Sequence, residues 1–90
     1  MRFNWGENKA ASNLSKHGVS FDEAKTVFDD PLYVDFYDPA HSDDEARYLI
    51  VGESNQRRLL IVSYTERGNL IRLISAREVT RTEREVYEEG

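Results

Sequence analysis

The stretch from Leu59 to Tyr87, LLIVSYTERGNLIRLISAREVTRTEREVY, decides the fold of this 90-residue chain. It holds two apolar, β-branched segments joined by the connection ERGN, and a connection that short favours an antiparallel hairpin. Thr80 is followed three residues later by Glu83, a capping-box pattern that predicts a helix beginning there and running through Tyr87. Arginines interrupt the apolar residues, and a guanidinium in a strand makes that strand a candidate anion site.

Two more strand candidates precede this stretch. The aromatic and β-branched run at 32–37 is typical of a strand, and the polar residues 38–45 that follow predict a loop. ARYLIVGE at 46–53 is the next apolar run, separated from the decisive stretch only by a short polar connection. We therefore expect a four-stranded antiparallel meander, with strands at 32–37, 46–53, 57–65 and 69–76.

Capping patterns predict two helices before the sheet. Asn4 with Glu7 is a candidate capping box for a first helix that ends at Gly18. Ser20 with Glu23 repeats the pattern for a second, shorter helix. The expected fold class is α+β, with two N-terminal helices packed on one face of the sheet, a short C-terminal helix, and the second sheet face left open.

Length and composition exclude several kinds of protein. Residues 1–90 are enough for a single domain. The chain has no cysteine, and its two histidines, His17 and His41, are far apart in sequence, so we expect neither a metal site nor a cofactor. It lacks an apolar run of the roughly 18 residues that a membrane span needs, and its N-terminus lacks the apolar core of a signal peptide. We expect a soluble, cytoplasmic protein with no membrane partner.

Charge is unevenly distributed along the chain. The net charge of −5, taken alone, argues against a nucleic-acid binder, because phosphate neutralisation supplies most non-specific affinity. Residues 1–45 carry four basic against ten acidic side chains, whereas residues 46–82 carry seven basic against three acidic ones. All seven are arginines, whose planar fork suits phosphate better than the mobile charge of lysine. Residues 46–82 are therefore the candidate anion-binding part.

The alternation of side chains along a strand predicts on which face of the sheet Arg72 lies. It alternates with Ile71 and Leu73, so it points to the opposite face from them, and burial of an unpaired guanidinium is costly. We therefore expect Arg72 on the open face. Arg47 and Arg58, in neighbouring strands, are candidates to join it there.

Several motifs together resemble the BrnT family of type II toxins. They are KHGVSFDEAKTVFDDP at 16–31, the set His41, Glu45 and Arg47 followed by Gly52, and YTERG with IRLISAR at 64–77. The resemblance covers nearly the whole chain. It implies a RelE-like fold, a ribonuclease that blocks translation, and a DNA-binding antitoxin of the BrnA kind. Operator DNA would then be contacted only through the antitoxin, and contact with the ribosome, a homodimer and a 2:2 toxin–antitoxin complex are compatible with it.

The resemblance also implies site residues, namely Glu66, Arg67, Arg72 and Arg77. Metal-independent RNA cleavage needs a base for the 2′-hydroxyl, stabilisation of the phosphorane and an acid for the 5′-oxygen. Arg72 and Arg77 are candidates for holding the phosphate, Glu66 or a histidine for the base, and Tyr64 or a histidine for the acid. The candidate catalytic set is Arg72, Arg77, Glu66, Arg67, Tyr64 and His41, and the candidate RNA-binding set is Arg47, Arg58, Arg81, Lys16 and His17.

Each candidate also has a structural interpretation. Arg72 could pair across strands with Glu53 or Glu66, and Arg77 could bind a helix carboxylate such as Glu83. A tyrosine at position 64 is more often a core aromatic than an acid. Lys16 and His17, just before Gly18, could simply interact favourably with the negative end of the helix dipole. Glu66 and Arg67 lie in a turn, where polar residues are common in any case.

Two further interpretations remain open. The acids of the 38–45 loop, together with exposed aromatics such as Tyr33, Phe36 and Tyr37, could form the surface that a basic antitoxin covers. The chain could also be a catalytically weak module that binds its antitoxin and acts mainly as a transcriptional co-repressor. The net acidity and the absence of a clear acid–base pair favour that second function.

Overall fold

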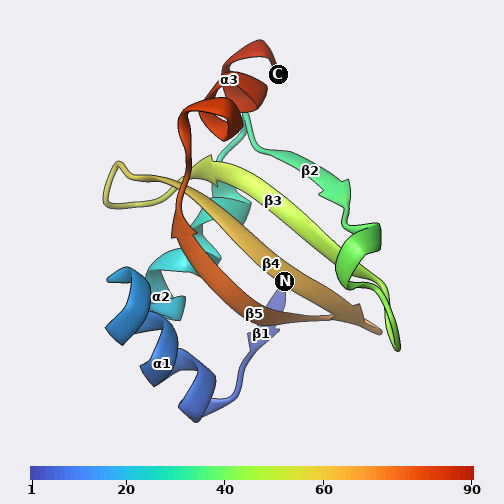
Figure 1. The fold of residues 1–90 in the computed structure, drawn as a ribbon. Helices are drawn as coiled ribbons and strands as arrows, with labels where there is room; N and C mark the ends of the chain where they lie inside the picture. Colours follow the sequence, from blue (N-terminus) through green and yellow to red (C-terminus); the bar gives the residue numbers. More distant parts are fainter.

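The computed structural model describes residues 1–90 and contains a five-stranded mixed sheet with helical segments on both faces (Figure 1). The strands are β1 (Arg2–Asn4), β2 (Val34–Tyr37), β3 (Arg47–Glu53), β4 (Leu59–Arg67) and β5 (Leu70–Glu78). They lie in the order β1-β5-β4-β3-β2, with β1 parallel to β5 and the other pairs antiparallel. The helical segments are α1 (Glu7–His17), α2 (Phe21–Ala24), η1 (Lys25–Asp29), η2 (Pro39–His41) and α3 (Arg81–Glu89). None of these helices has the length and apolarity that crossing a membrane requires.

The four expected strands form an antiparallel meander, but the expectation that they make up the whole sheet is wrong, because β1 adds a fifth, parallel strand along β5. Asn4 lies opposite Arg72 in that pairing and belongs to β1, so the expected capping box with Glu7 is wrong as well. Helix α1 has Gly6 as its N-cap, without a side-chain hydrogen bond. Three residues are too few to show strand alternation, and for that reason the sequence pattern did not indicate β1.

Gly18 and the Thr80–Glu83 capping box form as expected, whereas the Ser20–Glu23 pattern gives only half of a capping box, because the Glu23 carboxylate binds Ser54 and Arg58 instead. Gly18 ends α1 in the left-handed conformation, with φ of 68°, which costs glycine little. The Ser20 hydroxyl accepts a hydrogen bond from the Glu23 backbone N–H and starts α2, which continues as the 3₁₀ segment η1. At α3, both reciprocal bonds of the Thr80–Glu83 capping box are present.

The main core lies between one sheet face and the segments α1, α2 and η1. Its largest fully buried side chains include Phe21, Val27, Ile50, Leu60 and Leu73. Aromatic contacts attach the N-terminal segment to this core, with ring centroids 5.8 Å apart for Trp5 and Phe21. Phe3 of β1 packs on Phe28 in the same edge-to-face manner, at 5.1 Å. The parallel strand β1 is therefore held by side-chain packing as well as by backbone pairing.

A smaller core lies on the opposite sheet face, where Val51, Leu59 and Ile61 are packed under Tyr87 of α3. The Tyr87 hydroxyl donates to Asp30 at 2.7 Å, which fastens α3 to the end of η1. The expectation that helices cover one face only is thus wrong at this end of the sheet. On the rest of this second face the one helical segment is the short 3₁₀ turn η2 (Figure 1).

A register shift interrupts the pairing of β4 with β5. Ser63 pairs with Ser75 and Tyr64 with Leu73, so Ile74 is the extra residue of a β-bulge. Beyond the end of β1, the side-chain amide of Asn13 continues the edge of β5 by bonding both the N–H and the C=O of Ala76, at 2.9 and 2.8 Å. The bulge shapes the floor of the candidate site, to which Ile74 and Ser75 belong.

Candidate functional site

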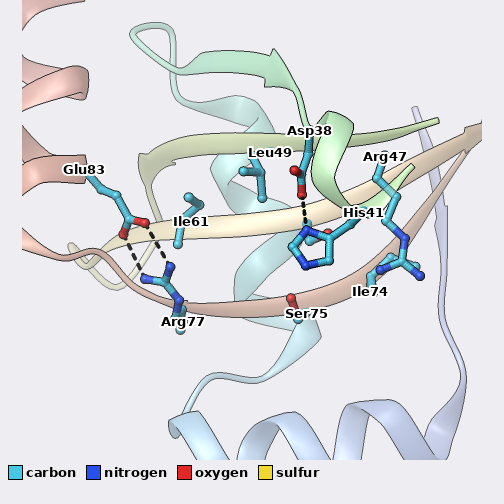
Figure 2. A pocket seen from close by; sticks show the side chains of 10 residues that line it. Asp38, His41, Arg47, Leu49, Ile61, Ile74, Ser75, Arg77 and Glu83 are labelled. Carbon is cyan, nitrogen blue, oxygen red and sulfur yellow. Dashed lines mark hydrogen bonds and ion pairs between the residues drawn. The ribbon is translucent and has the colours of Figure 1, made fainter. Parts of the chain in front are cut away.

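A pocket of about 370 Å³ opens on the second sheet face between η2 and α3, and we call it the η2–α3 pocket. Its floor comes from three strands and is made by Leu49, Ile61, Ser63, Ile74 and Ser75. Its walls carry Asp38, His41 and Arg47 on one side and Arg77 and Glu83 on the other (Figure 2). Both Ile74 and Ser75 reach it because of the bulge, which breaks the strict alternation of faces.

A histidine–carboxylate pair forms one wall of the η2–α3 pocket. The Nδ1 atom of His41 lies 2.9 Å from Oδ2 of Asp38 (Figure 2). A carboxylate only accepts hydrogen bonds, so Nδ1 is the donor in this contact, and in the neutral imidazole Nε2 is then the nitrogen with a free lone pair. The His41 side chain is 67% exposed and that of Asp38 13%, so the imidazole is accessible while its partner is held in the protein. This arrangement suits a general base.

The loop that carries His41 is anchored to the sheet. The Ser42 hydroxyl donates to the backbone carbonyl of Asp38 at 2.6 Å and accepts from the backbone N–H of Arg47 at 2.9 Å. The Asp38 N–H in turn donates to the Arg47 carbonyl at 2.8 Å. These contacts keep His41 above the sheet, a placement that the polar composition of residues 38–45 did not reveal.

The opposite wall is an ion pair between Arg77 and Glu83. The Arg77 guanidinium donates to both carboxylate oxygens of Glu83, at 2.8 and 2.9 Å, and also to the Glu78 carbonyl at 3.2 Å. The hydrogen bond from Arg77 lowers the pKa of Glu83, and the same bond raises the pKa of Arg77, so both groups are charged. Arg77 therefore binds a helix carboxylate, as the structural interpretation of the sequence predicted. Its guanidinium also lines the pocket.

Arg47 and Arg72 are the half-buried arginines of this face that form no ion pair. The strand register places Thr65 between them, opposite Arg47 of β3 on one side and opposite Arg72 of β5 on the other. Arg47 lines the η2–α3 pocket, whereas Arg72 lies one row further along the sheet. Neither glutamate considered from the sequence, Glu53 or Glu66, pairs with Arg72.

Tyr64 lies on the other sheet face, away from the pocket. It is 5% exposed and packs on Tyr48 and Phe28, with ring centroids 5.6 and 5.0 Å away. Its hydroxyl donates to Asp35 at 3.2 Å. Burial and the nearby carboxylate raise the pKa of Tyr64, which makes loss of its proton harder. The structure gives it the core position that the alternative interpretation assigned to it.

Arg58 is also directed away from the pocket, toward the buried carboxylate of Glu23. Its Nε donates to Glu23 at 3.0 Å, and its Nη2 donates both to Glu23 and to the Gly18 carbonyl. Ser54 donates a further hydrogen bond to Glu23 at 2.6 Å. The hydrogen bond from Arg58 lowers the pKa of Glu23 and raises that of Arg58 itself.

The remaining candidates are spread over the surface. Lys16 and His17 line a separate groove of about 180 Å³ with Lys9, on the α1 side of β5, and this groove shares Ile74 and Ser75 with the η2–α3 pocket. Arg67 binds Glu45 at the far end of β4. Glu66 and Arg81 are exposed and form no ion pair.

Several pocket residues were not singled out from the sequence as site residues. They are Asp38, Ser63, Ser75 and Glu83. The spacing of Asp38 and His41, three residues apart, is the signal that could have identified the pair. Nothing in the pattern marked the two serines, since an exposed strand face is commonly polar. No group of three or more His, Cys, Asp or Glu side chains lies close enough together to hold a metal ion.

The chain is a small α+β protein that presents a histidine–carboxylate pair and arginines on an open sheet face. Side chains of these kinds can bind anionic ligands. A family model described as "Ribonuclease toxin, BrnT, of type II toxin-antitoxin system" matches residues 5–83, and the chain belongs to that family. This confirms the resemblance inferred from its motifs. Family membership also implies an antitoxin partner, because a type II toxin is paired with a protein antitoxin.

A solved structure supports the fold. The chain is similar to the crystal structure of the Brucella abortus ribonuclease toxin BrnT, with a TM-score of 0.66 and 24% sequence identity. The similarity covers 90% of this chain and 99% of that chain. No curated protein sequence matches the chain.

Proposed function

We propose that this protein is a metal-independent endoribonuclease whose active site is the η2–α3 pocket, and that it inhibits translation by cutting RNA. One observation carries the proposal: the Asp38–His41 pair faces Arg77 across an open sheet face, with Arg47 on the same wall. A general base and two guanidiniums supply two of the three functions that cleavage beside a 2′-hydroxyl requires, namely deprotonation of that hydroxyl and stabilisation of the phosphorane. Membership of a ribonuclease toxin family supports the same reaction.

The proposed reaction begins at Nε2 of His41, which accepts the proton of the 2′-hydroxyl. The bond between O2′ and phosphorus forms, the bond between phosphorus and O5′ breaks, and the 5′-oxygen receives a proton from solvent. The products are a 2′,3′-cyclic phosphate and a 5′-hydroxyl end. Asp38 stabilises the imidazolium, while Arg47 and Arg77 stabilise the charge that develops on the phosphate oxygens.

The proposed catalytic set is smaller than the set considered from the sequence. Tyr64 is left out because it is buried on the opposite face, and Glu66 is left out because it does not line the pocket. Arg67 and Arg72 remain candidates for binding RNA outside the scissile position. So do Lys16 and His17, whose groove adjoins the pocket across β5.

Substitution of His41 tests the proposal directly. We expect His41→Ala to slow cleavage of a defined RNA by about 100-fold or more, since positioned acid–base groups contribute roughly that much. Arg47→Ala should slow it by a comparable factor through loss of charge stabilisation. The measurement is a time course of end-labelled RNA with purified protein, in which the 2′,3′-cyclic phosphate is identified.

The control is Arg84→Ala, which removes an exposed arginine of α3 that forms no ion pair and lies outside the pocket. It should cleave at the wild-type rate. Because His41 is largely exposed, its substitution should leave the far-UV circular dichroism unchanged. Full activity in a folded His41→Ala protein would contradict the proposed site.

We further propose that the partner is a BrnA-like antitoxin and that the protein contacts operator DNA only through it. We also propose that the fold is RelE-like. The outer edge of β2 is the surface we assign to that antitoxin. It exposes Leu32, Tyr33, Phe36 and Tyr37, and residues 29–45 contain seven acidic side chains and no lysine or arginine. A basic segment with apolar side chains fits this surface.

The backbone of β2 supports the same assignment. The Asp38 N–H bonds to the Arg47 carbonyl, so the alternation of antiparallel pairs leaves the N–H and C=O groups of Asp35 and Tyr37 turned away from β3. A free strand edge of this kind accepts another strand. Two copies of this chain are poor partners for each other here, because their acidic edges would repel.

A further inference from the structure

Three arginines gather around one carboxylate beside the η2–α3 pocket. Arg67 donates two hydrogen bonds to Glu45, at 3.2 and 2.7 Å. Arg47 and Arg72 carry charges close enough to Glu45 to lower its pKa further, after the hydrogen bond from Arg67. We call Arg47, Arg67 and Arg72 the arginine cluster. By strand alternation all three point to the same sheet face as the pocket floor.

A buried hydroxyl without a partner lies inside this cluster. Thr65 is 0% exposed, its Oγ1 forms no hydrogen bond, and the register places it between Arg47 and Arg72. Asn4 is next in the same row, and its Oδ1 is also buried without a partner. Buried polar atoms are seldom left unpaired, because each has given up its hydrogen bonds to water. The Asn4 Oδ1 atom only accepts hydrogen bonds, whereas the Thr65 hydroxyl can donate one. The position of Thr65 between two arginines therefore indicates a ligand that carries oxygen acceptors.

The charges of the cluster are not balanced within the protein. Three guanidiniums face one carboxylate, and neither Arg47 nor Arg72 forms an ion pair. Asp43 and Asp44, on the same loop as Glu45, are exposed and form no ion pair either. A carboxylate and a phosphate offer a guanidinium the same pair of oxygen acceptors, so either could occupy this position.

We propose that the arginine cluster is a second phosphate-binding site, which takes the phosphodiester next to the scissile one, and that Glu45 occupies the site until RNA displaces it. Arg47 lines the η2–α3 pocket and also a second hollow of about 220 Å³ that it shares with Asp43, Asp44 and Glu45. Arg47 therefore connects the arginine cluster to the η2–α3 pocket. The identity of the ligand as RNA rests on the proposed function. The site itself rests on the unpaired arginines and the unpartnered hydroxyl.

Binding of an uncleavable RNA separates this site from catalysis. A fluorescent oligonucleotide with 2′-O-methyl groups lacks the nucleophile, so its dissociation constant reports binding alone. We expect Glu45→Gln to bind it about 3- to 10-fold more tightly than wild type, because the competing carboxylate is gone. The matched control is Glu85→Gln, which removes the same charge from an exposed position on α3 and should change affinity less than about twofold.

The arginines should show the opposite effect. Arg72→Gln should weaken binding and reduce the slope of log affinity against log salt by about 1, the change expected for one lost phosphate contact. In the double variant Glu45→Gln/Arg72→Gln, most of the gain seen for Glu45→Gln should disappear, since the two residues act on one ligand. A gain that persists without Arg72, or one no larger than that of Glu85→Gln, would overturn the inference.

Cleavage of unmodified RNA, measured in parallel, keeps the two proposals apart. If cleavage depends on His41 while the cluster variants bind as wild type does, the second phosphate site is refuted and the proposed function stands. If the cluster variants alter binding as expected but no RNA is cut, the proposed reaction is refuted and the binding site stands.

Discussion

Arg58 shows how an arginine next to a strand can belong to the core. The sequence placed it among the RNA-binding candidates because arginines dominate residues 46–82. In the structure it neutralises Glu23, whose side chain is 2% exposed. Whether such a guanidinium faces a ligand or a buried acid depends on the partner across the fold, and Glu23 is 35 residues away in sequence.

We expect Arg58→Ala to lower the free energy of unfolding by about 3 kcal/mol, because it leaves Glu23 as a buried carboxylate with only Ser54 as a side-chain donor. Urea unfolding followed by circular dichroism measures the change. Arg57→Ala is the matched control, since Arg57 is exposed and forms no ion pair, and it should lie within about 0.5 kcal/mol of wild type. Equal stability of the two variants would show that the buried pair contributes little.

Helix ends that are set by neighbouring residues were predictable from the sequence. Features that depend on pairing with distant residues were not. The Thr80–Glu83 capping box and the glycine that ends α1 act within a few residues, so the pattern alone indicates them. Strand β1 and the bulge at Ile74 depend on partners far along the chain. The second predicted helix exists as one turn of α-helix followed by a 3₁₀ segment.

Strand β2 is the element that a partner can test. We expect the double variant Leu32→Ala/Phe36→Ala to weaken binding of the antitoxin at least about tenfold, because both side chains are exposed at the β2 edge. Titration calorimetry with the purified antitoxin measures this. Leu14→Ala, which truncates an exposed leucine of α1, should leave the affinity unchanged. Wild-type affinity in the double variant would place the antitoxin elsewhere.

Charge is segregated in the whole molecule, both along the sequence and in space. Residues 29–45 concentrate acids along the β2 edge and its loop, while unpaired arginines lie on the adjacent sheet face. Several other charged side chains form ion pairs within the protein, such as Arg58 with Glu23 and Arg77 with Glu83. The net charge of −5 therefore says little about the local potential that a ligand meets.

These internal pairs predict how stability depends on pH. The pKa of Glu23 and that of Glu83 are lowered in the folded protein by their arginine partners. A carboxyl with a lowered folded pKa stabilises the fold above its unfolded value, 4.5, and that contribution is lost as the pH falls through the folded pKa. We expect the urea midpoint to be nearly constant from about pH 8 to 5 and to fall below about pH 4.5.

The variant Glu23→Gln checks the source of this dependence. It should be less stable than wild type at pH 7 and should lose less stability between about pH 5 and 3, because one titrating group has been removed. The control Glu85→Gln should follow the wild-type curve, since its glutamate is exposed and unpaired. An unchanged slope in Glu23→Gln would assign acid unfolding to other groups.

The sequence by itself determined the α+β class, four of the five strands to within two residues of their ends, the last helix, and the family. These rest on period, capping and motif, which are properties of neighbouring residues. It also indicated Arg47, Arg77 and His41 as candidate site residues, but not that they would line one pocket. Only the tertiary structure decided that Asp38 holds His41 over the sheet, that Tyr64 and Arg58 face the core side, and that Arg67 binds Glu45. The physical reason is that an ionisable side chain takes its role from the charges and hydrogen-bond partners around it, and chain crossings bring those partners together from distant positions.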